Sequence, residues 1–130
     1  MSMGRRVLYV EDNAANLALV TKVLNHVGYA VEGAVDGEEG LDKLAASPPD
    51  LVLVDLDLPG IDGFEVIRRI KASSAHGGLP VIAISASVMK QERDQAMAAG
   101  CIAFIEKPFD IGELRVAVDE AITGVTPSQH

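Results

Sequence analysis

The chain has 130 residues, of which 48% are hydrophobic and 23% charged, a composition typical of a folded globular protein. Its formal net charge is −8 and no segment concentrates Lys and Arg, which argues against nucleic acid or an anionic membrane surface as a partner. No run reaches the ~20 apolar residues of a membrane helix. The single cysteine excludes an internal disulfide and fits a reducing cytoplasm.

Strand-like and helix-like patterns alternate along the chain. Strands are predicted at 5–10, 30–34, 51–54, 80–84 and 102–105. A helix is predicted after each strand: the first ends at Gly28, the second begins at Asp36, the third begins near Gly63, the fourth spans roughly 88–99 and the fifth begins at Asp110. This alternation predicts an α/β fold in which a parallel sheet carries helices on both faces.

Hydrophobic patterning also predicts where each element lies. The runs 7–10, 51–54 and 81–84 are apolar throughout and suit central strands, whereas 30–34 alternates and suits an edge. The fourth helix is different, because Met89, Ala96 and Met97 are its best apolar candidates and charged or polar residues separate them. At ~25 cal/mol per Å² of buried apolar surface, we expect this helix to be weakly held.

The chain is predicted to be one domain over residues 1–130, with a core at about 4–123. Residues 1–4 and 126–130 are predicted to be a short disordered leader and tail. Because the chain stops soon after the fifth helix, no output domain is expected.

Polar residues follow four of the predicted strands. Glu11 and Asp12 follow the first strand, Asp55 the third, Ser85 the fourth and Lys107 the fifth. The carboxyl ends of parallel strands meet at one edge of a sheet, so these side chains are expected to share a pocket. Three carboxylates that share a pocket repel one another, which indicates a site that holds a cation or tunes a reaction.

The types of residue in this group indicate phosphoryl chemistry. Carboxylates bind a hard cation such as Mg²⁺, which can hold a phosphoryl oxygen. One carboxylate can attack phosphorus and become an acyl phosphate. The Lys107 ammonium group and Mg²⁺ would then stabilise the oxygens of the transferring group, and the Ser85 hydroxyl could donate to it.

These residues, in this order, resemble the receiver domain of bacterial two-component response regulators over roughly residues 4–123. The matching motifs are Val10-Glu11-Asp12-Asn13, Asp55 through Pro59 with Asp62-Gly63, Ser85-Ala86 and Lys107-Pro108-Phe109. The pair Asn13 and Asn16, together with the chain end, is similar to single-domain relay regulators of the cell-cycle type and to hybrid-kinase receivers.

The resemblance implies a role for each residue of the site. Asp55 is the phosphoacceptor, which takes the phosphoryl group from a phosphohistidine of a sensor histidine kinase or a histidine phosphotransfer protein. Glu11 and Asp12 hold Mg²⁺ together with Asp55 and the backbone carbonyl of Asp57. Lys107 contacts the phosphate.

The resemblance also implies a switch and a fold. Ser85 is the switch hydroxyl and Phe104 the switch aromatic, and a cis Lys107–Pro108 bond is expected. The fold is a flavodoxin-like three-layer sandwich of five βα units with strand order 2-1-3-4-5. Such a domain is not an ordinary enzyme, although it catalyses its own phosphorylation and dephosphorylation. A cytoplasmic monomer or weak dimer that binds a downstream protein target is expected.

Two positions depart from the common family pattern. Leu58 stands where Met is frequent, which keeps the apolar volume. Asp57 is acidic where neutral or basic residues are common. We expect its side chain to face the pocket and hypothesise that it alters the lifetime of the acyl phosphate. Asp62 is interpreted as a turn residue or helix cap, and Gly63 as a requirement of the backbone.

Two other functions are compatible with parts of the sequence. Asp55-Leu56-Asp57 resembles the Asp-x-Asp motif of haloacid-dehalogenase-type phosphatases, although that motif belongs on the first strand and here follows the third. A nucleotide- or flavin-binding module is the other alternative. The turn after the first strand argues against it, because it lacks a Gly-rich cradle and its acids would repel phosphate.

Overall fold

The computed structural model describes residues 5–86 and 89–123. Within these ranges the chain forms one parallel sheet of five strands: β1 Arg6–Val10, β2 Ala30–Ala34, β3 Leu51–Asp55, β4 Val81–Ser85 and β5 Ala103–Glu106. The strand order is β2-β1-β3-β4-β5, which confirms the prediction. The predicted leader and tail both lie outside the described residues.

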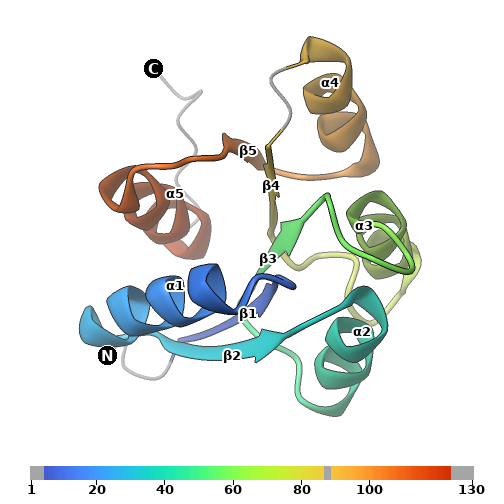
Figure 1. Ribbon diagram of the computed structural model, residues 1–130. Coiled ribbons are helices and arrows are strands. Elements are labelled where there is room, and N and C mark those ends of the chain that lie inside the picture. Colours follow the sequence, from blue (N-terminus) through green and yellow to red (C-terminus); the bar gives the residue numbers. More distant parts are fainter. Residues whose placement is uncertain (1–4, 87–88, 124–130) are drawn as a thin grey trace.

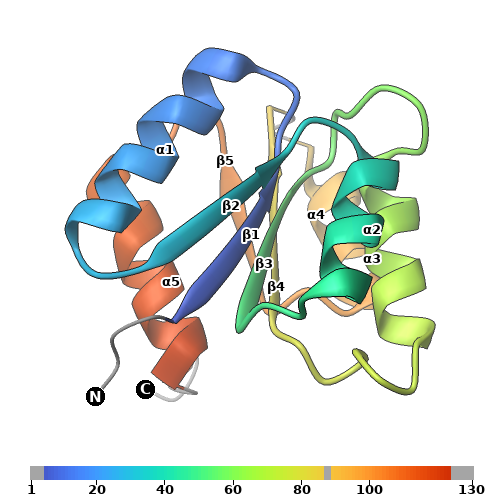
Figure 2. The same cartoon turned by 90° about the horizontal axis from the view of Figure 1, so that it is seen from below.

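Each strand is followed by a helix. The helices are α1 Ala14–His26, α2 Gly37–Ala46, α3 Gly63–Ala72, α4 Lys90–Ala99 and α5 Ile111–Thr123. Helices α1 and α5 cover one face of the sheet, and α2, α3 and α4 cover the other (Figures 1 and 2). The three layers confirm the predicted α/β fold of the flavodoxin-like type.

Burial distinguishes the interior strands of the sheet from the edge strand β2. Strands β3 and β4 are buried over their whole lengths, as their continuous apolar runs require, and they lie in the interior of the sheet. Strand β2 alternates between exposed and less exposed residues and lies at the edge. The pattern of hydrophobic residues therefore predicted both the centre and one edge of the sheet.

Two aliphatic clusters hold the layers together, one on each face of the sheet. On the α1 and α5 face, Val20 and Leu24 pack with Leu114 against the strands. On the other face, Ile67 and Ile70 of α3 do so, and Cys101 is buried among them as a small apolar residue. Burial raises the pKa of the Cys101 thiol to about 12.

Two aspartates fix the beginnings of helices on the sheet. Asp36 accepts a hydrogen bond from the Glu39 amide at 2.8 Å and caps α2, the helix that was predicted to begin there. Asp62 accepts from the Glu65 amide at 2.9 Å and caps α3, so its interpretation as a helix cap is confirmed.

Gly63 allows α3 to begin directly against the end of β3. A Cβ atom at this position would lie 2.5 Å from the carbonyl oxygen of Asp55 and 2.6 Å from Cα of Leu56. The interpretation of Gly63 as a backbone requirement is therefore confirmed: a side chain would push the helix away from the strand that carries Asp55.

Helix α4 buries little apolar surface. Among its described residues Ala96 is buried, whereas Met97 is 43% exposed, and Met89, which precedes the helix, is 60% exposed. Of the three apolar candidates named from the sequence, only Ala96 is therefore buried. The expectation of a weakly packed helix is supported. The predicted start at Val88 lies outside the described residues.

Three strands, β3, β4 and β5, end one residue later than predicted. Asp55 and Ser85 are therefore the last residues of β3 and β4 rather than the first residues after them. The ladder continues to this level because Asp55 pairs with Ile84, and the Leu56 amide donates to the Ile84 carbonyl at 2.8 Å. Both side chains therefore stand on regular strand, which fixes their position better than a loop does.

Candidate functional site

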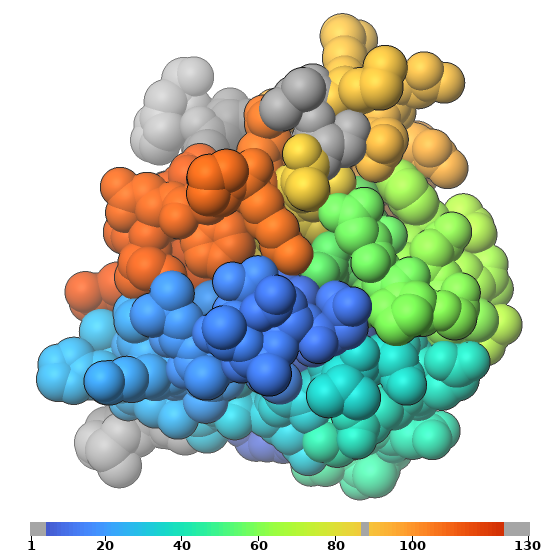
Figure 3. All heavy atoms as spheres, viewed as in Figure 1, coloured from blue at the N-terminus to red at the C-terminus, as the bar shows by residue number. Residues whose placement is uncertain are grey.

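The five polar residues predicted from the strand ends meet at one edge of the sheet. Asp55 and Ser85 end β3 and β4, Glu11 and Asp12 follow β1, and Lys107 follows β5. Val10 pairs with Val54, so the next residue along each strand brings Glu11 level with Asp55. Figure 3 shows the surface of this region, where the start of α1 in blue, the segment after β3 in green and the start of α5 in orange meet.

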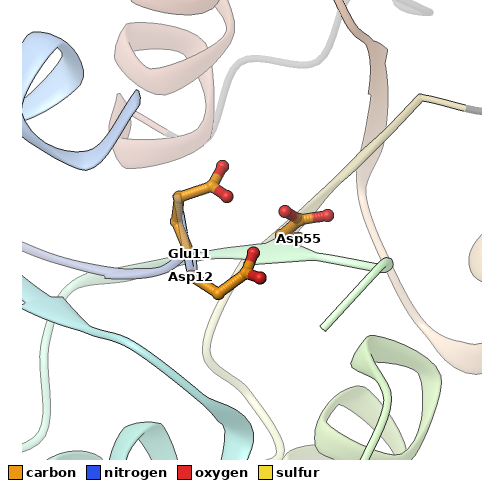
Figure 4. Close-up of side chains that lie close together, drawn as sticks. All are labelled: Glu11, Asp12 and Asp55. Atoms are coloured by element: carbon orange, nitrogen blue, oxygen red, sulfur yellow. The ribbon is translucent and has the colours of Figure 1, made fainter. Parts of the chain in front are cut away.

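Three carboxylates form the centre of the group. Glu11, Asp12 and Asp55 each offer an oxygen atom, and these atoms lie within 4.8 Å of one another. Figure 4 shows the three side chains turned toward a common space at the ends of neighbouring strands. Glu11 and Asp55 are buried and Asp12 is exposed, so the cluster opens to solvent on the Asp12 side. Oxygen ligands of this kind suit a hard divalent cation.

Lys107 supplies the positive charge of the group. Its Nζ atom lies 2.8 Å from Asp55 Oδ2 and 3.1 Å from Glu11 Oε1. Burial acts to lower the pKa of Lys107, but the attraction of Asp55 and Glu11 outweighs it, so this pKa lies above its ordinary value. The Lys107–Pro108 bond is cis, as expected.

The Asp55 carboxylate is held at both oxygens. Oδ2 accepts from Lys107, and Oδ1 accepts from the Asp57 amide at 2.9 Å. Burial raises the pKa of Asp55 above its ordinary value, and the neighbouring Glu11 adds to the rise, while Lys107 and the Asp57 amide oppose it. The Asp55 carboxylate therefore has a fixed orientation, and the fold stabilises its negative charge only in part. Both properties suit a nucleophile.

Glu11 has a partner that sequence reasoning missed. The hydroxyl of Tyr9 donates to Glu11 Oε1 at 2.8 Å, and the Asn13 amide donates to Oε2 at 3.1 Å. Burial raises the pKa of Tyr9, and Glu11 and Asp55 add to this shift. The signal in the sequence was a single hydroxyl in an otherwise aliphatic strand, two residues before an acid.

Asp57 does not join the three carboxylates. Among the described residues the cluster consists of Glu11, Asp12 and Asp55, and Asp57 is exposed beside it. Its Oδ2 atom accepts from the Ala86 amide at 3.1 Å, beyond the end of β4. The side chain therefore reaches toward the neighbouring strand end, at the edge of the pocket.

The two residues predicted to form a switch lie at different depths. Ser85 is buried at the end of β4, and its carbonyl accepts from the Lys107 amide at 2.8 Å. Phe104 is partly buried on β5, where it pairs with Ala83. The Arg93 guanidinium lies 5.2 Å from the centre of the Phe104 ring and 3.1 Å from Glu106 Oε1. This α4 contact at Phe104 was not predicted.

A hollow lies beside Lys107 on the α1 side of the site. It is lined by side chains of α1 and of the loops that follow β4 and β5: Asn16, Leu19, Val20, Ala86, Lys107, Pro108 and Phe109. The hollow therefore reaches the site through Lys107, which contacts Asp55. None of the helices in the described residues has the length and apolar content needed to cross a membrane.

Comparisons with known proteins agree with the fold and assign a family. A family model described as the response regulator receiver domain matches residues 7–119. The chain is 35% identical over 109 residues to the polar-differentiation response regulator DivK of Brucella anthropi, covering 84% of this chain and 89% of that protein. It is 34% identical over 125 residues to the response regulator MprA of Mycolicibacterium vanbaalenii, covering 96% of this chain and 53% of that protein.

Solved structures give the same result. A putative response regulator from Chloroflexus aurantiacus superimposes with a TM-score of 0.88 at 28% identity, covering 92% of this chain and 98% of that chain. The chemotaxis protein CheY4 of Vibrio cholerae gives a TM-score of 0.85 at 26% identity, with the same coverage of 92% and 98%.

The haloacid-dehalogenase alternative is not supported, because the matched family model, the relatives and the solved structures all describe response regulators. Sequence, fold and the position of the acids at the strand ends thus lead to one assignment. The chain belongs to the response regulator receiver domain family of two-component signalling.

Proposed function

We propose that the chain is a phosphorelay receiver that accepts a phosphoryl group on Asp55 from a phosphohistidine of a kinase or a phosphotransfer protein. One observation carries the proposal: the Asp55 carboxylate is buried at a strand end, with a lysine 2.8 Å away and two further carboxylates in one group with it. A structural aspartate would need the lysine but not the two additional acids.

The transfer is a displacement at phosphorus. An oxygen of Asp55 forms a bond to phosphorus while the bond between phosphorus and the imidazole nitrogen of the donor breaks, and the freed imidazole takes up a proton. Lys107 lies close enough to both Asp55 and Glu11 to remain beside the transferring group and offset its negative charge.

The acids fit a divalent cation. We propose that Glu11, Asp12 and Asp55 hold Mg²⁺ together with the backbone carbonyl of Asp57, since grouped carboxylate oxygens are ligands that Mg²⁺ accepts. The cation would neutralise part of the cluster and polarise the phosphoryl oxygens. The exposed position of Asp12 supports entry of the cation from solvent.

The output of the proposed switch is a change of protein contacts. Ser85 would donate to the phosphoryl group on Asp55, and Phe104 on the neighbouring strand would move with it. Helix α4 contacts this ring through Arg93 and buries little surface of its own, so it can change position at low cost. We propose that a downstream protein target reads this face, and that the protein acts in the cytoplasm as a monomer or weak dimer.

Incubation with Mg²⁺ and acetyl phosphate, followed by intact mass measurement, tests the proposal. Wild-type protein should gain one phosphoryl group, and removal of Mg²⁺ with EDTA should abolish the gain. Asp55→Asn should show no gain. Asp62→Asn is a matched control, because Asp62 is a carboxylate of the same β3–α3 segment that caps a helix outside the cluster. It should gain the group as the wild type does.

Two outcomes would contradict the proposal. One is the absence of any Mg²⁺-dependent adduct with acetyl phosphate and with a panel of phosphorylated kinases and phosphotransfer proteins. The other is an adduct that persists in Asp55→Asn. Repeated turnover of small phosphate esters would instead support the phosphatase alternative.

A further inference from the structure

The hydroxyl of Tyr9 is a polar group in an apolar layer. Tyr9 is 0% exposed and packs on the α1 and α5 face of the sheet in a cluster with Leu24 and Leu114. Its hydroxyl donates to Glu11 Oε1 at 2.8 Å, so β1 places a hydrogen-bond donor directly at one of the three clustered carboxylates.

The partners of Glu11 show what this donor does. Oε1 accepts from Tyr9 and lies 3.1 Å from Lys107 Nζ, while Oε2 accepts from the Asn13 amide. The Glu11 side chain is fully buried, so water does not replace a lost donor easily. Lys107 is shared with Asp55, at the shorter distance of 2.8 Å. Among the described residues, Tyr9 is therefore the side-chain donor that Glu11 does not share with Asp55.

We propose that Tyr9 is a positioning residue for the cation site: its hydroxyl fixes the Glu11 carboxylate toward Asp12 and Asp55. This inference rests on the proposed function. Without the hydroxyl, Lys107 is the side-chain donor to Oε1 that remains in the described part of the chain. We expect the carboxylate to turn toward the ammonium group and away from the cation. Loss of a group that orients a metal ligand typically weakens metal affinity by about 10- to 100-fold.

A purely structural role gives a different expectation. If the hydroxyl only satisfies a buried acid, its removal lowers stability but leaves the affinity for Mg²⁺ unchanged once the protein is folded. The proposed role instead predicts a weaker affinity for Mg²⁺ with little change in the phosphorylation rate. The concentration of Mg²⁺ at half-saturation should rise, while the rate of phosphorylation at saturating Mg²⁺ should change much less, because Asp55 and Lys107 are unaltered.

Tyr9→Phe tests the inference, because it removes one oxygen atom and keeps the ring. The affinity for Mg²⁺ is measured by isothermal titration calorimetry and, with Mn²⁺ as the probe, from the electron paramagnetic resonance signal of the free ion. We expect the dissociation constant to rise about 10-fold. Phosphorylation by acetyl phosphate at saturating Mg²⁺ should stay within about twofold of the wild type, which is small on the same scale.

The chain offers a matched control. Tyr29, its other tyrosine, also donates its hydroxyl to a carboxylate, that of Asp119 on α5, away from the cation group. Tyr29→Phe should leave the Mg²⁺ affinity unchanged. Replacing Tyr9 by para-aminophenylalanine, which restores a donor, should recover the affinity, whereas para-methylphenylalanine, which fills the space without a donor, should not. This second pair also decides the question if Tyr9→Phe does not fold.

The outcomes separate the two proposals. If the wild type binds no Mg²⁺ and forms no adduct, the proposed function fails. If the wild type binds Mg²⁺ and a folded Tyr9 variant without the donor binds it equally well, only the role of Tyr9 is overturned. Equal weakening in Tyr29→Phe would also overturn it, because the effect would then not depend on contact with Glu11.

Discussion

The buried position of Asp55 changes the ionisation of its carboxyl. Its pKa is raised because the carboxyl is buried and because Glu11 lies beside it, so the folded protein holds the proton more tightly than the unfolded chain does. The ionised form that the proposed reaction needs therefore costs stability. As pH falls below the folded pKa of Asp55, the folded carboxyl becomes neutral and this cost shrinks, and it is gone below the pKa of the unfolded chain.

Asp55→Asn should consequently stabilise the protein at neutral pH. We expect a gain of about 1 kcal/mol in the free energy of unfolding at pH 7, the usual size of gain when a functional compromise is removed. The gain should shrink as pH falls through the folded pKa of Asp55, because the wild-type carboxyl is then neutral too. Urea unfolding at several pH values measures this difference. A variant less stable than the wild type at pH 7 would contradict the prediction.

Asp57 places a negative charge at the edge of the same pocket, where its carboxylate accepts from the Ala86 amide. Asp57→Asn keeps an oxygen that can accept from this amide but removes the charge. We expect faster phosphorylation by an anionic donor and a longer-lived acyl phosphate, each by about fivefold, which corresponds to about 1 kcal/mol.

Stopped reactions followed by intact mass measure the two rates. Asp57→Ala separates the charge from the contact, because it removes both. If the Asn and Ala variants agree, the charge is responsible. If both rates in Asp57→Asn stay within about twofold of the wild type, the hypothesis about Asp57 is wrong.

At the scale of the elements, α4 differs from the other helices. One of its described residues is buried, whereas α3 buries four, including Val66, Ile67 and Ile70. Ala96 and the partly buried Ala99 pack on the core, and Arg93 contacts Phe104 and Glu106 at the surface. Surface ion pairs of this kind contribute at most about 1 kcal/mol.

Hydrogen exchange should therefore be fastest in α4 among the helices. The amides of α4 should exchange through local opening, at least about tenfold faster than those of α3, because few apolar contacts oppose the opening. Amide exchange measured by NMR or mass spectrometry checks this. Equal protection of α3 and α4 would contradict it, and Arg93→Ala should increase exchange in α4 without affecting α2.

The sequence predicted the strands and the meeting of their ends, but not several side-chain contacts. Continuous apolar runs and the acids that follow them identified the central strands, Asp55 and the convergence of the strand ends, because these depend on local pattern and on the geometry of parallel sheets. The contacts Tyr9–Glu11, Asp57–Ala86 and Arg93–Phe104 were not predicted. Each depends on which of several side-chain orientations the packed structure selects, and periodicity carries no information on that choice.

At the scale of the whole molecule, the acids of one edge and the net charge of −8 have the same sign. A cation bound among Glu11, Asp12 and Asp55 would relieve repulsion in the folded state that the unfolded chain lacks. Binding to the folded state alone raises stability, by about 2.7 kcal/mol when the ligand is at 100 times its dissociation constant.

Mg²⁺ should therefore raise the thermal unfolding midpoint of the wild type, with a dependence on concentration that follows its binding isotherm. Sodium chloride at matched ionic strength controls for general screening of the net charge. Asp12→Asn should show a much smaller shift than the wild type, and Asp62→Asn the full shift. A shift of equal size with sodium chloride, or in Asp12→Asn, would contradict a specific site.

The close approach of Gly63 to Asp55 limits how this site could be moved to another protein. A Cβ at position 63 would lie 2.5 Å from the Asp55 carbonyl oxygen, so the acid and the glycine have to be transferred together. Grafting the acid onto the end of a strand in another βα scaffold, without a glycine at the start of the following helix, would leave the carboxylate on a displaced strand end. The transferable object is the whole segment from Asp55 to Gly63.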